Sequence, residues 1–317
     1  MKRIMAAPPQ NTHTSLGYRI KRELHKNRYV YLMIIPVALY YIIFCYGPMF
    51  GVVIAFKEFD IGRGIFESPW VGLKHFKSFL ADMYFGRLIR NTVLISFYDL
   101  LFGFPAPIIL ALLLNEIKSL WFKRSIQTIA YLPHFISVVV ICGMIADFFS
   151  ADGLVTKFLV VLGGEKVNYL GDAKYFRSVF VGTNIWQGIG WNSIIYMAAL
   201  SGVDAQLYEA AVIDGAGRWR QVIHITIPEI VPTIIILLIL RMGQIMSVGF
   251  EKIILLYNPG TYETADVISS YVYRRGLSES FQYSYSAAVG IFQSVVNLFL
   301  LITANKVSNR LTETSLF

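Results

Sequence analysis

Residues 204–228 combine residue types and spacings that suit docking against another protein better than catalysis. A first short helix is predicted from residues that recur at helical spacing, namely Leu207, Ala210, Ala211 and Asp214. Gly215 and Gly217 are expected to take the positive φ that reverses the chain, and Pro228 is expected to stop a second short helix. Small alanine side chains would let another surface approach the backbone closely. An interfacial hairpin with no partner is the alternative that periodicity alone leaves open.

Two charged residues, Asp99 and Arg241, fall inside otherwise apolar stretches. Charges at membrane depth are costly, so they usually face a cavity or pair with another charge. One interpretation is a structural ion pair, formed by these two residues or with a partner subunit. The other is that Arg241 attracts a solute with a carboxylate, because a guanidinium can donate two parallel hydrogen bonds to it.

Aromatic and amide side chains gather in the later apolar stretches, where such groups either bind polar solutes or hold helices together. The members expected to line a path for a solute, together with Arg241, are Asn184, Trp186, Gln187, Trp191, Asn192, Tyr196, Gln244, Gln293 and Asn297. For any single member packing is the better explanation, so the prediction concerns the set. His134 is interpreted as a helix-packing residue, and the other histidines are too scattered to predict a metal site.

Long apolar stretches must position these residues. Of the 317 residues, 56% are hydrophobic and only 15% are charged, against about 25% charged in soluble domains. A membrane span needs about 20 mostly apolar residues, and six stretches qualify: 29–56, 91–114, 125–146, 178–203, 230–250 and 280–305. None shows the alternation of a β-barrel strand. The composition therefore predicts an all-α polytopic membrane protein with six transmembrane helices, and it excludes an ordinary soluble enzyme.

The distribution of charge predicts the orientation. The net charge of +8 forms no single basic face, so no nucleic-acid partner is expected. Seven basic residues against one acid in the tail 1–28 place the N-terminus in the cytoplasm. Six spans in a membrane domain 29–305 return the tail 306–317 to the same side. The remaining loops divide their basic residues almost evenly, so the orientation depends on the N-terminal tail.

Glu209-Ala210-Ala211, Asp214-Gly215-Ala216 and the later Ile225 to Pro228 resemble the EAA loop of binding-protein-dependent ABC importer permeases. Weaker matches extend over nearly the whole chain, among them Trp70-Val71-Gly72-Leu73, Gly103-Phe104-Pro105-Ala106-Pro107, Tyr131-Leu132-Pro133-His134-Phe135 and Gly190-Trp191-Asn192. Together these stretches resemble the permease branch that imports oligosaccharides released from plant and algal polysaccharides.

The resemblance implies a type I ABC importer permease fold, embedded in the lipid of a bacterial inner membrane. It implies that oligosaccharides, including acidic fragments such as those of alginate or pectin, arrive on an extracytoplasmic binding protein. A second homologous permease and two ATPase subunits would complete the importer. The residues that would contact the ATPase are Glu209, Ala210, Ala211, Asp214, Gly215 and Ala216.

The chain itself is expected to bind no cofactor and to catalyse no reaction. No G-x-x-x-x-G-K-[ST] phosphate-binding loop occurs in it, so ATP and Mg are expected on the partner ATPase.

Two other classes stay open at this point. A membrane-embedded enzyme would need convergent carboxylates or a His/Asp cluster, and a secondary transporter would favour inverted repeats with discontinuous helices. Neither class explains the EAA-like segment. The sequence leaves open which sugar is carried, whether this chain or its partner permease holds it, and whether Arg241 is structural or faces it.

Overall fold

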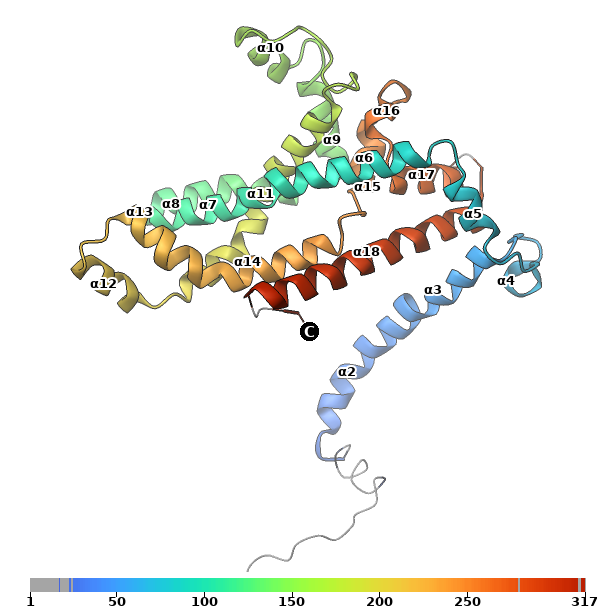
Figure 1. The fold of residues 1–317 in the computed structure, drawn as a ribbon, viewed down its shortest axis with the longest axis horizontal. Helices are drawn as coiled ribbons and strands as arrows, with labels where there is room; N and C mark the ends of the chain where they lie inside the picture. The colour runs from blue at the N-terminus through green and yellow to red at the C-terminus, as the bar shows by residue number, and fades with distance from the viewer. Residues whose placement is uncertain (1–16, 18–22, 24, 279, 313–314, 317) are drawn as a thin grey trace, which may run out of the picture. The chain divides into compact units, whose positions relative to one another are not determined.

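The computed structural model describes the chain apart from residues 1–16, 18–22, 24, 279, 313–314 and 317 (Figure 1). Most of the predicted tail 1–28, and part of the predicted tail 306–317, therefore lie outside the described residues. Packing divides the chain into two compact units, 1–53 and 54–317.

The described residues are organised as helices, which confirms the predicted all-α class; the one isolated β-bridge among them joins Lys57 and Trp70. The first unit contains α2 (Arg28–Tyr40), η1 (Tyr41–Tyr46), α3 (Gly47–Met49) and the start of η2 (Phe50–Phe56). The α-helices of the second unit are α4 (Gly64–Glu67), α5 (Lys74–Leu80), α6 (Phe85–Tyr98), α7 (Pro105–Glu116), α8 (Leu120–Tyr131), α9 (Val138–Phe148), α10 (Leu154–Val161), α11 (Phe176–Ser201), α12 (Ala205–Ile213), α13 (Arg218–Gln221), α14 (Ile227–Met242), α15 (Phe250–Leu256), α16 (Tyr262–Ala265), α17 (Ile268–Tyr273) and α18 (Tyr283–Thr312). Short π- or 3₁₀-helical segments between them are η3 (Asp99–Gly103), η4 (Leu132–Phe135), η5 (Val222–Thr226), η6 (Pro259–Thr261) and η7 (Arg274–Ser278).

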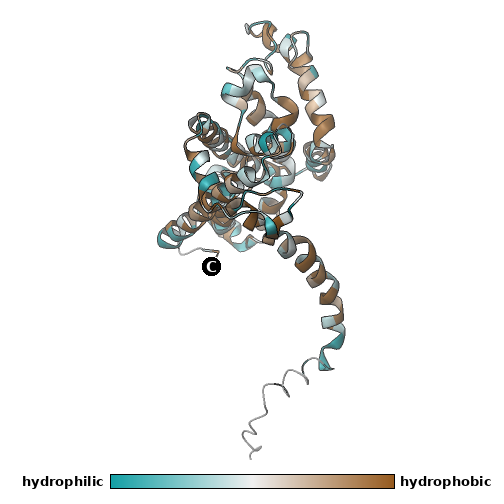
Figure 2. Cartoon of the chain, turned by 90° about the vertical axis from the view of Figure 1, so that its right-hand side faces the viewer, coloured by the Kyte–Doolittle hydropathy of each residue, from teal (hydrophilic) through white to brown (hydrophobic). Residues whose placement is uncertain are grey.

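Helices long and apolar enough to cross a membrane occupy most of the predicted spans. Within the described residues, four qualify as single helices: Arg28–Phe56, Phe85–Glu116, Arg218–Met242 and Tyr283–Arg310. A bent pair, Leu120–Phe135 with Val138–Phe148, makes a fifth when its two helices are counted as one span. The remaining predicted span is α11, whose 26 residues extend about 39 Å, enough for a hydrocarbon core of about 30 Å. Brown, hydrophobic residues recur along the helices drawn in Figure 2, as a lipid environment requires.

The predicted third span, 125–146, is wrong as a single straight helix, because the chain bends by 103° between α8 and α9. Pro133 lies in η4 at the bend and lacks the N–H that a continuing helix would use. Ser137 then starts α9, since its side chain accepts a hydrogen bond from the Val140 N–H.

The predicted fifth span, 230–250, is wrong at both ends. The helix already begins at Arg218 and ends at Met242, and residues 243–249 are irregular. Side chains of α18 satisfy this irregular backbone: Asn297 Oδ1 accepts from the Met246 N–H (3.0 Å), and Gln293 Nε2 donates to the Met246 carbonyl (2.7 Å). Irregular backbone at membrane depth is tolerated where protein groups satisfy it in this way.

Helix α11 packs closely against neighbouring helices in the core of the second unit. Helix α11 packs along α7, α8 and η3, and buried Tyr196 and Leu200 of α11 join Ala111 of α7 and Ile230 of α14 in one core cluster. At the crossing with α8, Gly190 is buried and leaves no room for a side chain. Close helix approach through small residues is typical of membrane helix pairs.

A buried ionic network fastens α16 and α17 to α6. Asp266 is fully buried and pairs with Arg274 (2.7 Å) and Arg87 (3.4 Å), while its carbonyl accepts a hydrogen bond from Asn91 Nδ2 (2.9 Å). Arg177 donates to Asn91 Oδ1 (2.7 Å), which extends the network to α11.

A second acid, Asp82, lies in the turn before α6. Its carboxylate accepts hydrogen bonds from the hydroxyls of Tyr271 (2.5 Å) and Tyr285 (2.9 Å) and from the Tyr84 N–H (2.9 Å). Burial by itself would raise the pKa of Asp82, but these hydrogen bonds and nearby Arg275 outweigh it, so the pKa is lowered.

Replacing Asp82 with Asn is expected to reduce the loss of stability in acid. Because folding lowers this pKa, Asp82 stabilises the fold fully above its ordinary pKa of about 4, and that contribution is lost as the pH falls through the lower folded value. Thermal unfolding in detergent between about pH 3 and pH 6 measures the effect. Asp152→Asn is the control, because its partner Lys166 is exposed and such pairs contribute little. Identical pH slopes for the wild type and Asp82→Asn would contradict the prediction.

Candidate functional site

The segment 204–221 forms a helical hairpin, which we call the coupling hairpin after the contact that the resemblance to an EAA loop implies for it. Its first helix, α12, begins where the Asp204 carboxylate accepts a hydrogen bond from the Gln206 N–H (2.9 Å). It ends in a Schellman motif: the Ala216 N–H donates to the Ala211 carbonyl (2.8 Å), and Gly215 has φ +74°. Gly215 therefore reverses the chain in the way expected for a residue with no Cβ.

Gly217 and Pro228 differ from expectation. Gly217 has φ −69°, because it is the extended residue that precedes α13 and takes no part in the reversal. Pro228 does not stop the second helix, since Arg218–Met242 is one continuous helical stretch. The π-helical segment η5 ends two residues before Pro228, and such a local widening accommodates a residue that cannot donate a backbone hydrogen bond.

Three polar contacts hold the coupling hairpin as a unit on the membrane domain. Gln221 Nε2 donates to the Ala216 carbonyl (2.9 Å), which ties α13 to the turn that follows α12. Tyr208 and Thr226 hydroxyls hydrogen-bond (2.9 Å), which joins α12 to η5 below it. Arg218 forms an ion pair with Glu116 at the end of α7 (3.4 Å). The hairpin is therefore connected to α14 through the continuous helical stretch Arg218–Met242 and to α7 through one exposed ion pair.

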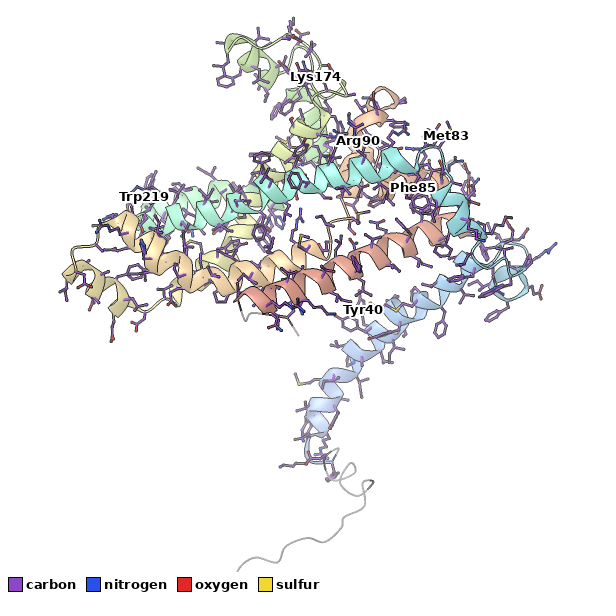
Figure 3. The ribbon with its side chains drawn as sticks, in the orientation of Figure 1. Tyr40, Met83, Phe85, Arg90, Lys174 and Trp219 are labelled. Atoms are coloured by element: carbon purple, nitrogen blue, oxygen red, sulfur yellow. The ribbon has the colours of Figure 1, made fainter. Side chains whose placement is uncertain are left out.

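The outer surface of the coupling hairpin mixes acid, small and apolar side chains. Of the residues predicted to contact an ATPase, Glu209, Ala210, Asp214 and Gly215 are exposed, while Ala211 and Ala216 are half-buried. Large apolar side chains are exposed beside them: Val212, Ile213 and Trp219, at 64%, 86% and 78%. Figure 3 shows Trp219 on α13, the second helix of this hairpin. An exposed apolar patch ringed by polar groups is typical of a protein interface.

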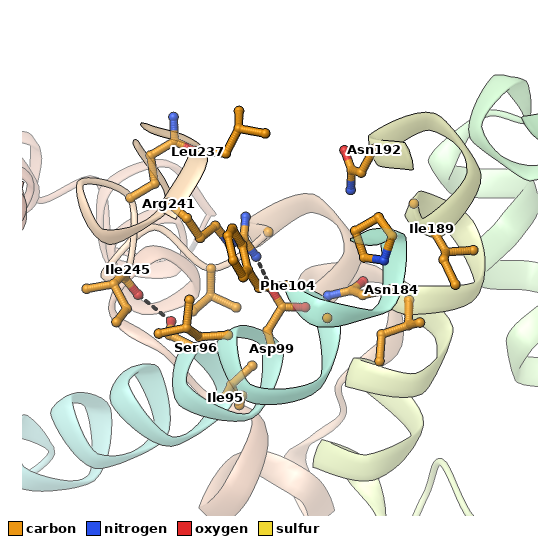
Figure 4. Close-up of a pocket in the computed structure, with 18 of the residues that line it drawn as sticks. Ile95, Ser96, Asp99, Phe104, Asn184, Ile189, Asn192, Leu237, Arg241 and Ile245 are labelled. Atoms are coloured by element: carbon orange, nitrogen blue, oxygen red, sulfur yellow. Dashed lines mark hydrogen bonds and ion pairs between the residues drawn. The ribbon is translucent and has the colours of Figure 1, made fainter. Parts of the chain in front are cut away.

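The second candidate site is a cavity of about 440 Å³ between the C-terminal ends of α6 and α14 and the middle of α11, which we call the polar cavity (Figure 4). Asp99 of η3 and Arg241 of α14 form an ion pair in its wall, and they are the charged residues among those that line it. The Arg241 side chain is 49% exposed and that of Asp99 12%. The pair was one of the two arrangements expected for these charges.

Five of the ten predicted path residues line the polar cavity: Asn184, Asn192, Tyr196, Arg241 and Gln244. Asn184 and Asn192 face it from α11, opposite the ion pair in Figure 4, and Tyr196 is almost fully buried. The cavity therefore combines amide and phenol groups, one ion pair and apolar walls formed by residues such as Ile95 and Leu237. This combination suits a polar solute that bears hydroxyl and carboxylate groups.

The other five predicted path residues lie elsewhere. Gln293 and Asn297 hold residues 243–249, as described above, and both also hydrogen-bond the Ser247 hydroxyl (3.4 and 3.0 Å). Trp186 lines a separate, largely apolar cavity, and half-buried Gln187 lines neither. Trp191 stacks on His134 at the α8–α9 bend, with ring centroids 4.5 Å apart.

Sequence reasoning missed Ser96, Ser247 and Trp219. Ser96 lines the polar cavity and donates to the Ile245 carbonyl, and Ser247 lines it from the irregular segment. Ser96 lies one helical turn before Asp99, so helical spacing from the charged residue could have identified it. Within the described part of the chain, no three His, Cys, Asp or Glu side chains come together in a way that could hold a metal ion.

Comparison with known proteins places these features in context. The profile of a family described as "Binding-protein-dependent transport system inner membrane component" matches residues 103–313. Protein LplB of Bacillus subtilis (strain 168) is 45% identical over 295 residues, which cover 93% of this chain and 92% of LplB. The polygalacturonan/rhamnogalacturonan transport system permease protein YteP of the same organism is 43% identical over 300 residues, 94% of this chain and 93% of YteP.

Solved structures show the same fold. A bacterial ABC transporter involved in the import of the acidic polysaccharide alginate contains a chain with a TM-score of 0.85 and 43% identity, covering 93% of this chain and 99% of that one. A second structure, of bacterial alginate ABC transporter in complex with an alginate pentasaccharide-bound periplasmic protein, gives a TM-score of 0.85 at 42% identity, covering 94% and 100%.

Proposed function

Since this chain belongs to the family of binding-protein-dependent transport system inner membrane components, we propose that it is an oligosaccharide permease subunit of an ATP-driven importer. The observation that supports this best is the combination of a polar cavity between spans with a rigid, exposed hairpin at the end of the same helix. Helix α14 connects the two directly, because Arg218–Met242 is continuous and Arg241 lies at its far end.

The substrate class is an oligosaccharide derived from a polysaccharide, with acidic fragments favoured. The related YteP is named for polygalacturonan and rhamnogalacturonan, and the structural neighbours are alginate transporters. The groups of the polar cavity agree with this class, since amides can hydrogen-bond sugar hydroxyls and a guanidinium can bind a carboxylate. The sugar would arrive on an extracytoplasmic binding protein, as a complex with a periplasmic protein is known for one neighbour.

The coupling hairpin is proposed to seat in an ATPase subunit, with Glu209, Ala210, Ala211, Asp214, Gly215 and Ala216 at the contact. ATP and Mg would bind that partner and not this chain. Closure of two ATPase subunits would then move the hairpin as a rigid body and, through α14, change access to the polar cavity. A second, homologous permease would provide the other half of the path, and both termini would lie in the cytoplasm.

Purification from the native membrane in mild detergent tests the proposal. The chain is expected to bring down an ATPase and a second permease, identified by mass spectrometry. Recovery of the chain alone, with uptake that follows an ion gradient and needs no ATP, would favour a secondary transporter. A catalytic activity of the isolated chain on a sugar or lipid would favour the membrane-embedded enzyme.

A further inference from the structure

We propose that Arg241 binds the carboxylate of an acidic sugar in the polar cavity, and that Asp99 is its positioning residue, which orients the guanidinium and weakens its hold. This inference depends on the proposed function and adds the residues that select an acidic substrate. It rests on the ion pair, on the unequal exposure of its two members and on the groups around them.

The Arg241 guanidinium has N–H donors that its ion pair with Asp99 does not use. A guanidinium carries five N–H groups, and Nη2 of Arg241 faces Asp99 Oδ2. Within the described residues, Asp99 is the polar partner that the structure gives Arg241. Half of the Arg241 side chain is exposed, and Arg241 is a lining residue of the cavity, so its remaining edge is open to a ligand.

Asp99, by contrast, is fixed in the wall. It begins the π-turn η3, and a Cβ built on Gly103 would lie only 3.0 Å from Asp99 Oδ1 and 3.7 Å from Ile185. Glycine at position 103 thus leaves the space that the carboxylate occupies. A side chain confined in this way can hold a flexible arginine in one place.

The backbone at Arg241 is held as firmly. Arg241 lies in the last turn of α14, where the negative end of the helix dipole favours a cation. The segment that follows is fixed by the bond of Ser96 to the Ile245 carbonyl and by Gln293 and Asn297 of α18. Arg241 is therefore held at both ends: neighbouring groups fix its backbone, and Asp99 holds its guanidinium.

Asp99 also adjusts the strength of binding. A lone guanidinium in a cavity of low dielectric would hold a carboxylate tightly, whereas a transport site must release its solute. With Asp99 in place the empty cavity holds no net charge, and two carboxylates share one cation when the sugar binds. A neutral sugar would meet only the amide and phenol groups, so the cavity favours an acidic oligosaccharide.

Direct binding to the purified importer complex, without its binding protein, tests the assignment. The probes are a uronate tetrasaccharide and the same tetrasaccharide with its carboxyl groups reduced to alcohols. Wild type should prefer the uronate. Arg241→Gln should bind both equally, and Asp99→Asn should bind the uronate about tenfold more tightly but transport it more slowly, a split that loss of structure would not produce. Asp152→Asn, in an exposed ion pair, is the matched control and should leave both affinities unchanged.

The inference is overturned if Asp99→Asn weakens uronate binding, or if both substitutions change the two affinities by the same factor, as a purely structural pair would. Arg241→Lys provides a second route where Arg241→Gln fails to assemble: it keeps the charge but loses the planar fork, so a reduced preference for the uronate is expected. An assembled complex that binds neither sugar would overturn this inference alone. Absence of the ATPase and the second permease would instead overturn the proposed function.

Discussion

Replacing Glu209 with Lys is expected to abolish the stimulation of ATP hydrolysis by loaded binding protein, while the spans still insert. Glu209 is exposed on α12 and makes no ion pair or side-chain hydrogen bond within the described residues, so the change should leave this chain's own fold intact. Breaking one side of a charge contact buried between proteins costs about 2–5 kcal/mol, or about 30-fold or more in affinity. The measurement is ATPase activity of the reconstituted importer with and without loaded binding protein.

Gly215→Pro tests the same surface through its geometry. Gly215 has φ +74°, whereas proline requires a φ near −65°, so the Schellman reversal cannot form and α12 loses its direction. Stimulated ATP hydrolysis should again be lost. Gly217→Ala is the matched control, because Gly217 has φ −69° and a Cβ there meets nothing within 4 Å. Normal stimulation in Glu209→Lys and Gly215→Pro would contradict the coupling role.

The second large effect is expected from Gly190→Ala, at the crossing of α11 and α8. A Cβ at Gly190 would lie 2.2 Å from the Ala130 carbonyl oxygen and 2.8 Å from Cδ1 of Tyr131. The obstacle is backbone, so α8 would have to move, and with it the bend into α9. Overpacking of this kind costs about 1–3 kcal/mol and occasionally more. The expected result is a large fall in folded yield and in the thermal unfolding midpoint in detergent.

Gly182→Ala, on the same helix, is the matched control for Gly190→Ala. A Cβ at Gly182 meets nothing within 4 Å, and alanine in a helix interior is favoured over glycine by about 0.5–1 kcal/mol. The two substitutions should therefore move the unfolding midpoint in opposite directions. If Gly190→Ala were as stable as the wild type, the close crossing of α11 and α8 would be wrong.

The coupling hairpin was largely predictable because its geometry is local. The N-cap of Asp204 and the positive φ of Gly215 follow from residues a few positions apart, and helical spacing was sufficient to place α12. The errors at Gly217 and Pro228 have one cause. Each residue type permits a break but does not require one, and the π-turn η5 allowed the helix to continue.

The kinds of side chain that line the polar cavity were predictable, but the particular residues that line it were not. Asn184, Asn192 and Tyr196 all line the cavity from α11, and Trp186, two positions after Asn184, falls on another face of the helix. Gln187 and Trp191, three and seven positions after Asn184, share its side of the helix, so spacing alone could not set them aside. Gln293 and Asn297 also share a face, but they contact residues 243–249, which were expected to be helical. A role that depends on a misassigned segment far along the chain cannot be read from local spacing.

The measurement that tests the central claim most directly is uptake of a labelled acidic oligosaccharide into proteoliposomes that contain the complete importer. Uptake is predicted to require three components together: the loaded binding protein outside, ATP with Mg on the ATPase side, and an intact coupling hairpin. Uptake is also predicted to be lost in Gly215→Pro and retained in Gly217→Ala. Uptake that proceeds without ATP, or that Gly215→Pro leaves unchanged, would contradict the account.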